Sequence, residues 1–198
     1  MSDTETPVPT PDRHVLIAGG GASGMTCALF LARAGLTVTV MDQNRSILKR
    51  GLLHNYPGVP PVVGNDWLAH TKGLLDDFDK VHWFNGRINA LKATGSGFVA
   101  ETSGDPIEGD LLVIASGQTP TPFIDGLGLD TVDPIQPYVQ TNIVVDKWGR
   151  TNVEGVYACG VVAGFPSQAV ITAGSGANVA IGIINGLRGE FWVDHDEV

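Results

Sequence analysis

The chain has 198 residues, of which 43% are hydrophobic, and its formal net charge at pH 7 is -9. A chain of this length buries the core of a single domain, while its negative charge repels nucleic acid and anionic membrane surfaces. We see neither an apolar stretch of about 20 residues nor a basic-then-apolar leader, so we expect a cytoplasmic protein with no nucleic-acid or membrane partner.

The first part of the chain predicts a tail followed by a βαβ unit. Residues 1–12 are polar, interrupted by prolines and without hydrophobic periodicity, so we expect a disordered tail before a single domain at residues 13–198. His14–Ala18 predicts a buried parallel strand, Met25–Ala34 an apolar helix and Leu36–Met41 a second strand. Together they have the usual size of a βαβ motif, about thirty residues.

The middle of the chain has the pattern of hairpins. Turn signals at Asn85-Gly86 and at residues 95–97 separate three β-rich segments, Lys80–Phe84, Arg87–Thr94 and Phe98–Thr102. We therefore predict that these three segments form a small antiparallel meander.

The last part of the chain returns to buried strands and closes with a helix. Asp110–Ala115 predicts another parallel strand, Ile143–Val145 and Val156–Ala158 predict short strands, and Gln168–Leu187 predicts a long helix rich in alanine, isoleucine and glycine. The expected fold class is α/β: a Rossmann-like three-layer domain with a parallel sheet, helices and a small antiparallel β-meander.

A glycine-rich sequence, Gly19-Gly-Gly-Ala-Ser-Gly24, follows the first strand and opens the first helix. In this position Gly19 permits a tight turn, Gly21 lets a pyrophosphate approach the backbone, and Gly24 lets the helix pack closely on the strand. The alternative is a turn that is merely rich in glycine.

The residues around this sequence favour a dinucleotide site over that alternative. Ala22 and Ser23 begin the helix, whose N-terminal amides attract phosphate. Asp42 ends the second strand, where a carboxylate accepts hydrogen bonds from ribose hydroxyls, and we place the adjacent Gln43 in the same site. Lys49 and Arg50 follow closely and either reach the nucleotide or are solvated.

Five segments, in this order, resemble the flavin-domain motifs of the thioredoxin reductase family: Gly19–Gly24, His54–Gly58, Leu111–Gly117, Thr151–Gly160 and Gln168–Gly174. Together they cover nearly everything between residues 14 and 188. The resemblance implies FAD as the cofactor, an oxidoreductase of the pyridine nucleotide-disulfide type, and a homodimer formed through the flavin domain.

The roles of the family's residues carry over to the matching positions. Asn55 would contact the flavin, and the start of the last helix would lie against the flavin pyrimidine. The remaining positions implied by the resemblance are Ala115, Ser116 and Gly117 on the adenine side, Gly160 and Val161 near the ribityl chain, and Gln168 and Ala169 at the start of the last helix.

Three features depart from the family pattern. The nicotinamide-binding domain is missing between Gly117 and Thr151, and no Cys-x-x-Cys motif exists, since Cys27 and Cys159 are far apart. Val161 stands where the family carries an aspartate that binds the ribityl chain. Electrons would therefore come from outside: from a free reduced nicotinamide, a separate electron-donor protein such as a ferredoxin, or a small reductant.

Two other functions stay open on the sequence. One is a non-catalytic FAD- or dinucleotide-binding module, or a subunit that works only with a partner chain. The other is a dinucleotide-binding remnant that prefers NAD or ADP-like ligands. Cys27 is interpreted as a core residue, whereas Cys159 lies beside the proposed ligand turn and could be a thiol near the flavin. The histidines and cysteines are too scattered for a metal site, so none is expected.

Overall fold

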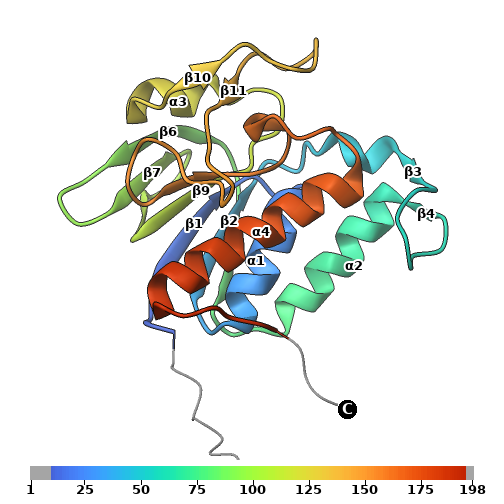
Figure 1. The fold of residues 1–198 in the computed structure, drawn as a ribbon, viewed down its shortest axis with the longest axis horizontal. Helices are drawn as coiled ribbons and strands as arrows, with labels where there is room; N and C mark the ends of the chain where they lie inside the picture. The colour runs from blue at the N-terminus through green and yellow to red at the C-terminus, as the bar shows by residue number, and fades with distance from the viewer. Residues whose placement is uncertain (1–9, 195–198) are drawn as a thin grey trace, which may run out of the picture.

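The computed structural model describes residues 10–194 (Figure 1). The first nine residues of the predicted tail lie outside the described residues. The last three residues of that tail precede the first strand, and two of them contact the fold. Arg188 Nε donates to Thr10 Oγ1 at 2.8 Å, and Lys80 Nζ donates to Asp12 Oδ1 at 3.3 Å.

A five-stranded parallel sheet forms the centre of the fold, in the order β12-β9-β1-β2-β5. Val15 in β1 aligns with Val38 in β2 on one side and with Leu111 in β9 on the other. The backbone N–H and C=O groups of β1 therefore pair with strands on both sides, as expected for a strand that is apolar on both faces. The strands are β1 (His14–Ala18), β2 (Thr37–Asp42), β5 (Val81–Asn85), β9 (Leu111–Ile114) and β12 (Val156–Ala158).

Helices cover one face of this sheet, and a meander with a short helix covers the other (Figure 1). Alternate residues of β1 divide between the two cores: Ile17 packs with the long helices and Leu16 with the meander. The helices are α1 (Ala22–Arg33), α2 (Gly64–Asp76) and α4 (Ala169–Arg188), and the opposite layer holds β6 (Ile88–Ala93), β7 (Phe98–Thr102), β8 (Ile107–Gly109) and α3 (Thr121–Leu127). The predicted three-layer α/β fold class is confirmed.

Short elements join these layers. The strands β3 and β4 pair with each other, as do β10 and β11, in two small antiparallel ladders outside the main sheet. The elements are η1 (Ile47–Arg50), β3 (Leu52–Leu53), β4 (Val62–Val63), β10 (Thr131–Val132), β11 (Asn142–Ile143) and η2 (Gly160–Ala163).

The placement of β5 corrects the prediction for the middle of the chain. We expected Lys80–Phe84 in the meander, but β5 pairs in parallel with β2, and the meander consists of β6, β7 and β8. A parallel neighbour requires a crossover, which α2 supplies and the sequence analysis missed. Its signal was available, since Leu68, Thr71 and Leu75 recur at helical spacing and are buried.

The two long helices α1 and α4 lie side by side on the sheet. A Cβ atom on Gly176 of α4 would lie 2.0 Å from the carbonyl oxygen of Ser23 in α1, so only glycine allows this approach. By length and composition α4 also qualifies as a membrane span, which the sequence analysis did not find. Half of its most apolar window is buried in the fold, as in the core helix of a folded domain.

Candidate functional site

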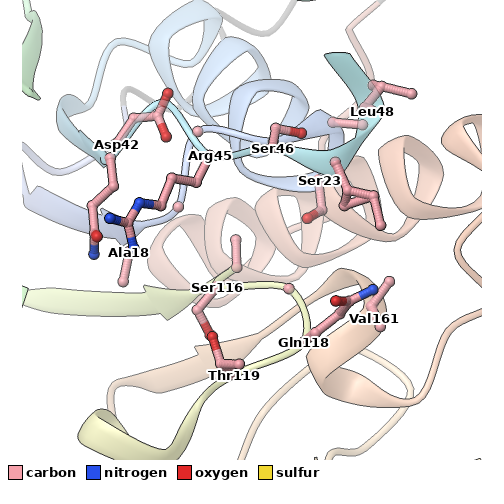
Figure 2. Close-up of a pocket in the computed structure, with 18 of the residues that line it drawn as sticks. Ala18, Ser23, Asp42, Arg45, Ser46, Leu48, Ser116, Gln118, Thr119 and Val161 are labelled. Atoms are coloured by element: carbon pink, nitrogen blue, oxygen red, sulfur yellow. The ribbon is translucent and has the colours of Figure 1, made fainter. Parts of the chain in front are cut away.

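A cavity of about 710 Å³ opens where β1, β2 and β9 end (Figure 2). Open α/β sheets bind ligands at this edge, beyond the carboxyl ends of their strands. Several separate stretches of the chain meet here. The predicted site residues that line the cavity are Gly19, Gly21, Ala22, Ser23, Asp42, Gln43, Ala115, Ser116, Gly117, Val161 and Ala169.

The glycine turn is held by close contacts with the backbone around it. Gly19 has a φ of +126°, and a Cβ there would lie 2.3 Å from the carbonyl oxygen of Ala115. A Cβ on Gly24 would lie 1.9 Å from the carbonyl oxygen of Gly19. At Gly21 the nearest atom to such a Cβ is Ser46 Oγ, at 3.6 Å, so space remains there for a ligand.

The N-terminus of α1 is suited to an anion. Gly21 is its N-cap residue, no side chain caps the helix, and its first turn contains no acidic residue. The first amides of a helix have no partner within the helix, and its dipole makes this end positive. Phosphate groups are a common partner for such an end.

Asp42 is held beside this turn by its own loop. Its Oδ1 accepts a hydrogen bond from the backbone amide of Asn44 at 2.9 Å. Asn44 has a φ of 60°, the one non-glycine residue with positive φ among the described residues, and its side chain accepts a hydrogen bond from Lys49. These contacts fix the loop that follows β2 before any ligand binds.

Ser116 contributes a polar atom without a partner. Its hydroxyl is buried and makes no hydrogen bond to any described residue. Figure 2 shows Ser23 reaching the cavity from α1 and Ser116 from the loop after β9. An unpaired buried hydroxyl costs about 1–3 kcal/mol, so a polar ligand atom at this position would relieve that cost.

The start of α4 forms the opposite end of the cavity from Asp42. Ser167, Ala169 and Thr172 line the wall there, and Gln168 is the N-cap residue. The Gln168 side chain does not line the cavity, because its Oε1 accepts a hydrogen bond from Asn55 Nδ2 at 2.8 Å. Asn55 is also outside the lining, and its hydrogen bond to Gln168 holds it next to the start of α4.

Two of the predicted glycines lie behind the cavity wall. Gly24 packs on Gly19, as described above. Gly160 packs against Ser23, since a Cβ at Gly160 would lie 2.6 Å from Ser23 Oγ, and its amide donates to Ser175 Oγ at 2.9 Å. Both glycines position the residues that face the cavity.

Several lining residues were not predicted: some lie within or next to the predicted motifs, and the others come from elements far away in the chain. Arg45 and Arg87 line the cavity, whereas Lys49 and Arg50, the basic pair that follows Asp42 in the sequence, do not. Arg45 was within reach of sequence reasoning, since it follows Asp42 closely. The other missed residues are Ala18, Gly20, Met41, Ser46, Ile47, Leu48, Ile88, Gln118, Thr119, Phe123, Ser167 and Thr172.

Both cysteines lie in the core and away from the cavity wall. Cys27 and Cys159 are fully buried and free. Burial raises the pKa of Cys159 from its ordinary value of 9.0 to about 12, although a hydrogen bond to Ser23 opposes the shift. Burial also raises the pKa of Cys27 well above that value. Neither thiol is placed for exchange with a ligand in the cavity. The described residues contain no cluster of side chains suited to a metal ion.

Comparisons with solved structures agree with this architecture. The thioredoxin reductase from Gloeobacter violaceus superposes with a TM-score of 0.76 at 19% identity, covering 94% of this chain and 99% of that structure. The oxidoreductase from Agrobacterium tumefaciens superposes with a TM-score of 0.77 at 16% identity, covering 86% and 97%. These likenesses concern the fold.

The sequence itself resembles longer reductases. The mercuric reductase of Streptomyces lividans is 26% identical over 88% of this chain and 34% of its own length. The nitric oxide reductase FlRd-NAD(+) reductase of Salmonella typhi is 30% identical over 79% of this chain and 37% of its own. The chain thus spans about a third of the length of these curated relatives. The family model for the pyridine nucleotide-disulphide oxidoreductases matches residues 3–177, and this chain belongs to that family.

Proposed function

We propose that this chain binds FAD in the cavity and acts as a flavin-dependent oxidoreductase with an external electron donor. The observation that carries the proposal is the meeting of three motifs at one cavity: the glycine turn, Asp42, and residues 115–117. Membership of the pyridine nucleotide-disulphide oxidoreductase family supports the same cofactor, because proteins of this family typically bind FAD.

The residues present fit the parts of an extended dinucleotide. The amides at Gly21, Ala22 and Ser23 would hold the pyrophosphate, and Asp42 would accept hydrogen bonds from the adenosine ribose. Ser116 also lines the cavity and offers its unpaired hydroxyl to a polar atom of the ligand. The flavin ring would then lie toward α4.

The N-terminus of α4 would favour the reduced cofactor. No side chain caps this helix, and its first turn contains no acidic residue. A bound FAD supplies electron transfer between a donor and an acceptor, and its ring gains negative charge on reduction. The positive end of a helix directed at that ring stabilises this charge, at about 0.3–1 kcal/mol when exposed to solvent.

The need for an external donor rests on what lies between β9 and β12. Besides its loops, that segment holds the short helix α3 and the small ladder of β10 and β11. It contains no second glycine motif of the kind that opens α1. A free reduced nicotinamide, a ferredoxin-like protein or a small reductant would therefore dock at the exposed ring.

One observation favours a second function, that of a non-catalytic dinucleotide-binding module. Val161 lines the cavity and offers no polar atom from its side chain. An aspartate at this position would make a charge-assisted hydrogen bond to the ribityl chain, worth about 1.5–3 kcal/mol. With valine in its place, flavin binding would be weaker by tenfold or more. Under this alternative the cavity holds a nucleotide but supports no turnover.

The purified protein tests both functions. We expect flavin absorption bands, with noncovalent FAD released on heating and taken up again on addition. Anaerobic stopped-flow mixing with NADPH should give slow, non-saturating reduction, because positioning of the nicotinamide can supply about 7–11 kcal/mol of acceleration and no domain in this chain provides it. A protein that stays colourless with added FAD contradicts the proposal. A loaded protein that no donor reduces supports the binding module.

A further inference from the structure

The charged side chains of the cavity are unusual for so acidic a protein. Among the lining residues the charged ones are Asp42, Arg45 and Arg87, which makes the wall net positive in a chain of net charge -9. Neither arginine takes part in any ion pair found among the described residues, whereas Arg13, Arg33 and three lysines do. Two cations thus line one cavity with no ion-pair partner in residues 10–194.

The backbone around both arginines is fixed relative to Asp42. Arg45 follows Asn44, whose left-handed conformation and hydrogen bond to Asp42 turn the loop. Figure 2 shows the Arg45 side chain extending past Asp42 toward Ala18. Arg87 is anchored on the other side, because the amide of Gly86 donates to the Asp42 carbonyl at 3.2 Å.

The order of the strands indicates which part of a dinucleotide these cations would meet. The glycine turn follows β1, Asp42 ends β2, and Arg87 follows β5, which is the next strand outward. A pyrophosphate at the glycine turn and a ribose at Asp42 put the nucleobase beyond the ribose, on the side of Arg87. Arg45 lines the cavity on the side of Asp42 as well (Figure 2).

We propose that Arg45 and Arg87 bind the adenine ring of the dinucleotide through their planar guanidinium groups and so select purine over pyrimidine nucleotides. This inference rests on the proposed function, since it assumes the same orientation of the ligand. Guanidinium groups stack on aromatic faces, which a lysine ammonium does less well. A larger purine ring offers more of that face than a pyrimidine.

Titration calorimetry with ADP and UDP tests the proposal without using flavin. Both probes carry the same ribose diphosphate, so contacts to phosphate affect them equally. We expect the unmodified protein to prefer ADP, and the double variant R45Q/R87Q to lose about fivefold to tenfold in ADP affinity with much less change for UDP. The double lysine variant R45K/R87K should remain weakened. R50Q, a matched loss of charge at a residue outside the cavity, should bind both probes as the unmodified protein does.

Three results would overturn the proposal: an unchanged ADP-to-UDP ratio in R45Q/R87Q, full recovery in R45K/R87K, or no binding of either probe to the unmodified protein. An equal loss for both probes would assign the arginines to phosphate instead. Failure of the proposed function is a separate outcome, because a protein that never takes up FAD can still bind ADP in this arginine-dependent way. Circular dichroism and the unfolding temperature of each variant establish that these exposed substitutions leave the fold intact.

Discussion

Asn55 and Gln168 lie 113 positions apart in the chain, and Asn55 Nδ2 donates a hydrogen bond to Gln168 Oε1 at 2.8 Å. The resemblance to the thioredoxin reductase family predicts that both contact a flavin ring, Asn55 from the loop after β3 and Gln168 from the start of α4. In the structure they are partners of each other at the α4 end of the cavity. A flavin ring bound there would present the amide groups of its pyrimidine edge. These groups could replace the hydrogen bond between the Asn55 donor and the Gln168 acceptor.

We expect Asn55→Ala to weaken FAD while leaving ADP untouched. The substitution removes the Asn55 amide and with it one neutral hydrogen bond to the flavin ring, worth about 0.5–1.5 kcal/mol. ADP has no flavin ring, so it does not reach this residue. Fluorescence titration with FAD and calorimetry with ADP measure the two affinities. A loss of ADP binding would show that Asn55 supports the fold of the cavity instead.

Asp42→Ala should weaken FAD and ADP alike, by about 1–3 kcal/mol, because both carry the ribose that the carboxylate would hold. Asp42→Asn is the control for the loop, since its amide oxygen can still accept the hydrogen bond from Asn44. We expect the asparagine variant to bind less tightly than the unmodified protein and more tightly than the alanine variant. Unchanged affinity in both would place the adenosine elsewhere.

Val161→Asp should tighten FAD binding by about tenfold or more, because a carboxylate at this cavity wall restores a charge-assisted hydrogen bond to the ribityl chain. ADP lacks that chain, so its affinity serves as the internal control and should not rise. Val161→Asn supplies a neutral group of the same shape and should give a smaller gain. If the aspartate variant loses FAD or unfolds, the wall has been repacked around valine and a buried charge finds no partner.

Gly176→Ala should destabilise the fold by about 1–3 kcal/mol, because its Cβ would lie 2.0 Å from the backbone oxygen of Ser23 and force α1 and α4 apart. Gly174→Ala on the same helix is the matched control. Beyond the adjoining backbone of its own helix, no atom lies within 4 Å of its added Cβ, so this substitution should stabilise the helix by about 0.5–1 kcal/mol. Urea unfolding of both variants measures the difference, and equal effects would contradict the close packing of the two helices.

The buried thiols should make the protein less stable as the pH rises above about 9. The unfolded chain releases the Cys159 proton near the ordinary pKa of 9.0, whereas the folded protein holds it until about 12. The folded state therefore binds more protons in that window, and the free energy of unfolding falls by up to about 1.4 kcal/mol per pH unit for each such thiol. Unfolding curves of C27A/C159A should lack this part of the slope. Reaction of either native thiol with a thiol reagent at neutral pH, before unfolding, would contradict the burial.

The sequence alone was enough to predict the elements whose conformation depends on a few neighbouring residues. The apolar run before Gly19, the left-handed turn itself and the helix behind it follow from steric limits on a few neighbouring residues, and the structure confirms that βαβ unit. Asp42 could be placed for the same reason, because a residue that ends the second strand of such a unit meets the glycine turn.

Which distant segments share the cavity depends on the packing of the whole domain. The position of β5 depended on the α2 crossover, and with it the arrival of Arg87 beside Asp42. The unpaired hydroxyl of Ser116, the burial of Cys159 and the bond between Asn55 and Gln168 likewise depend on elements far apart in the chain. Strand order and helix packing are settled by burial summed over the whole domain, so no short stretch of sequence contains them.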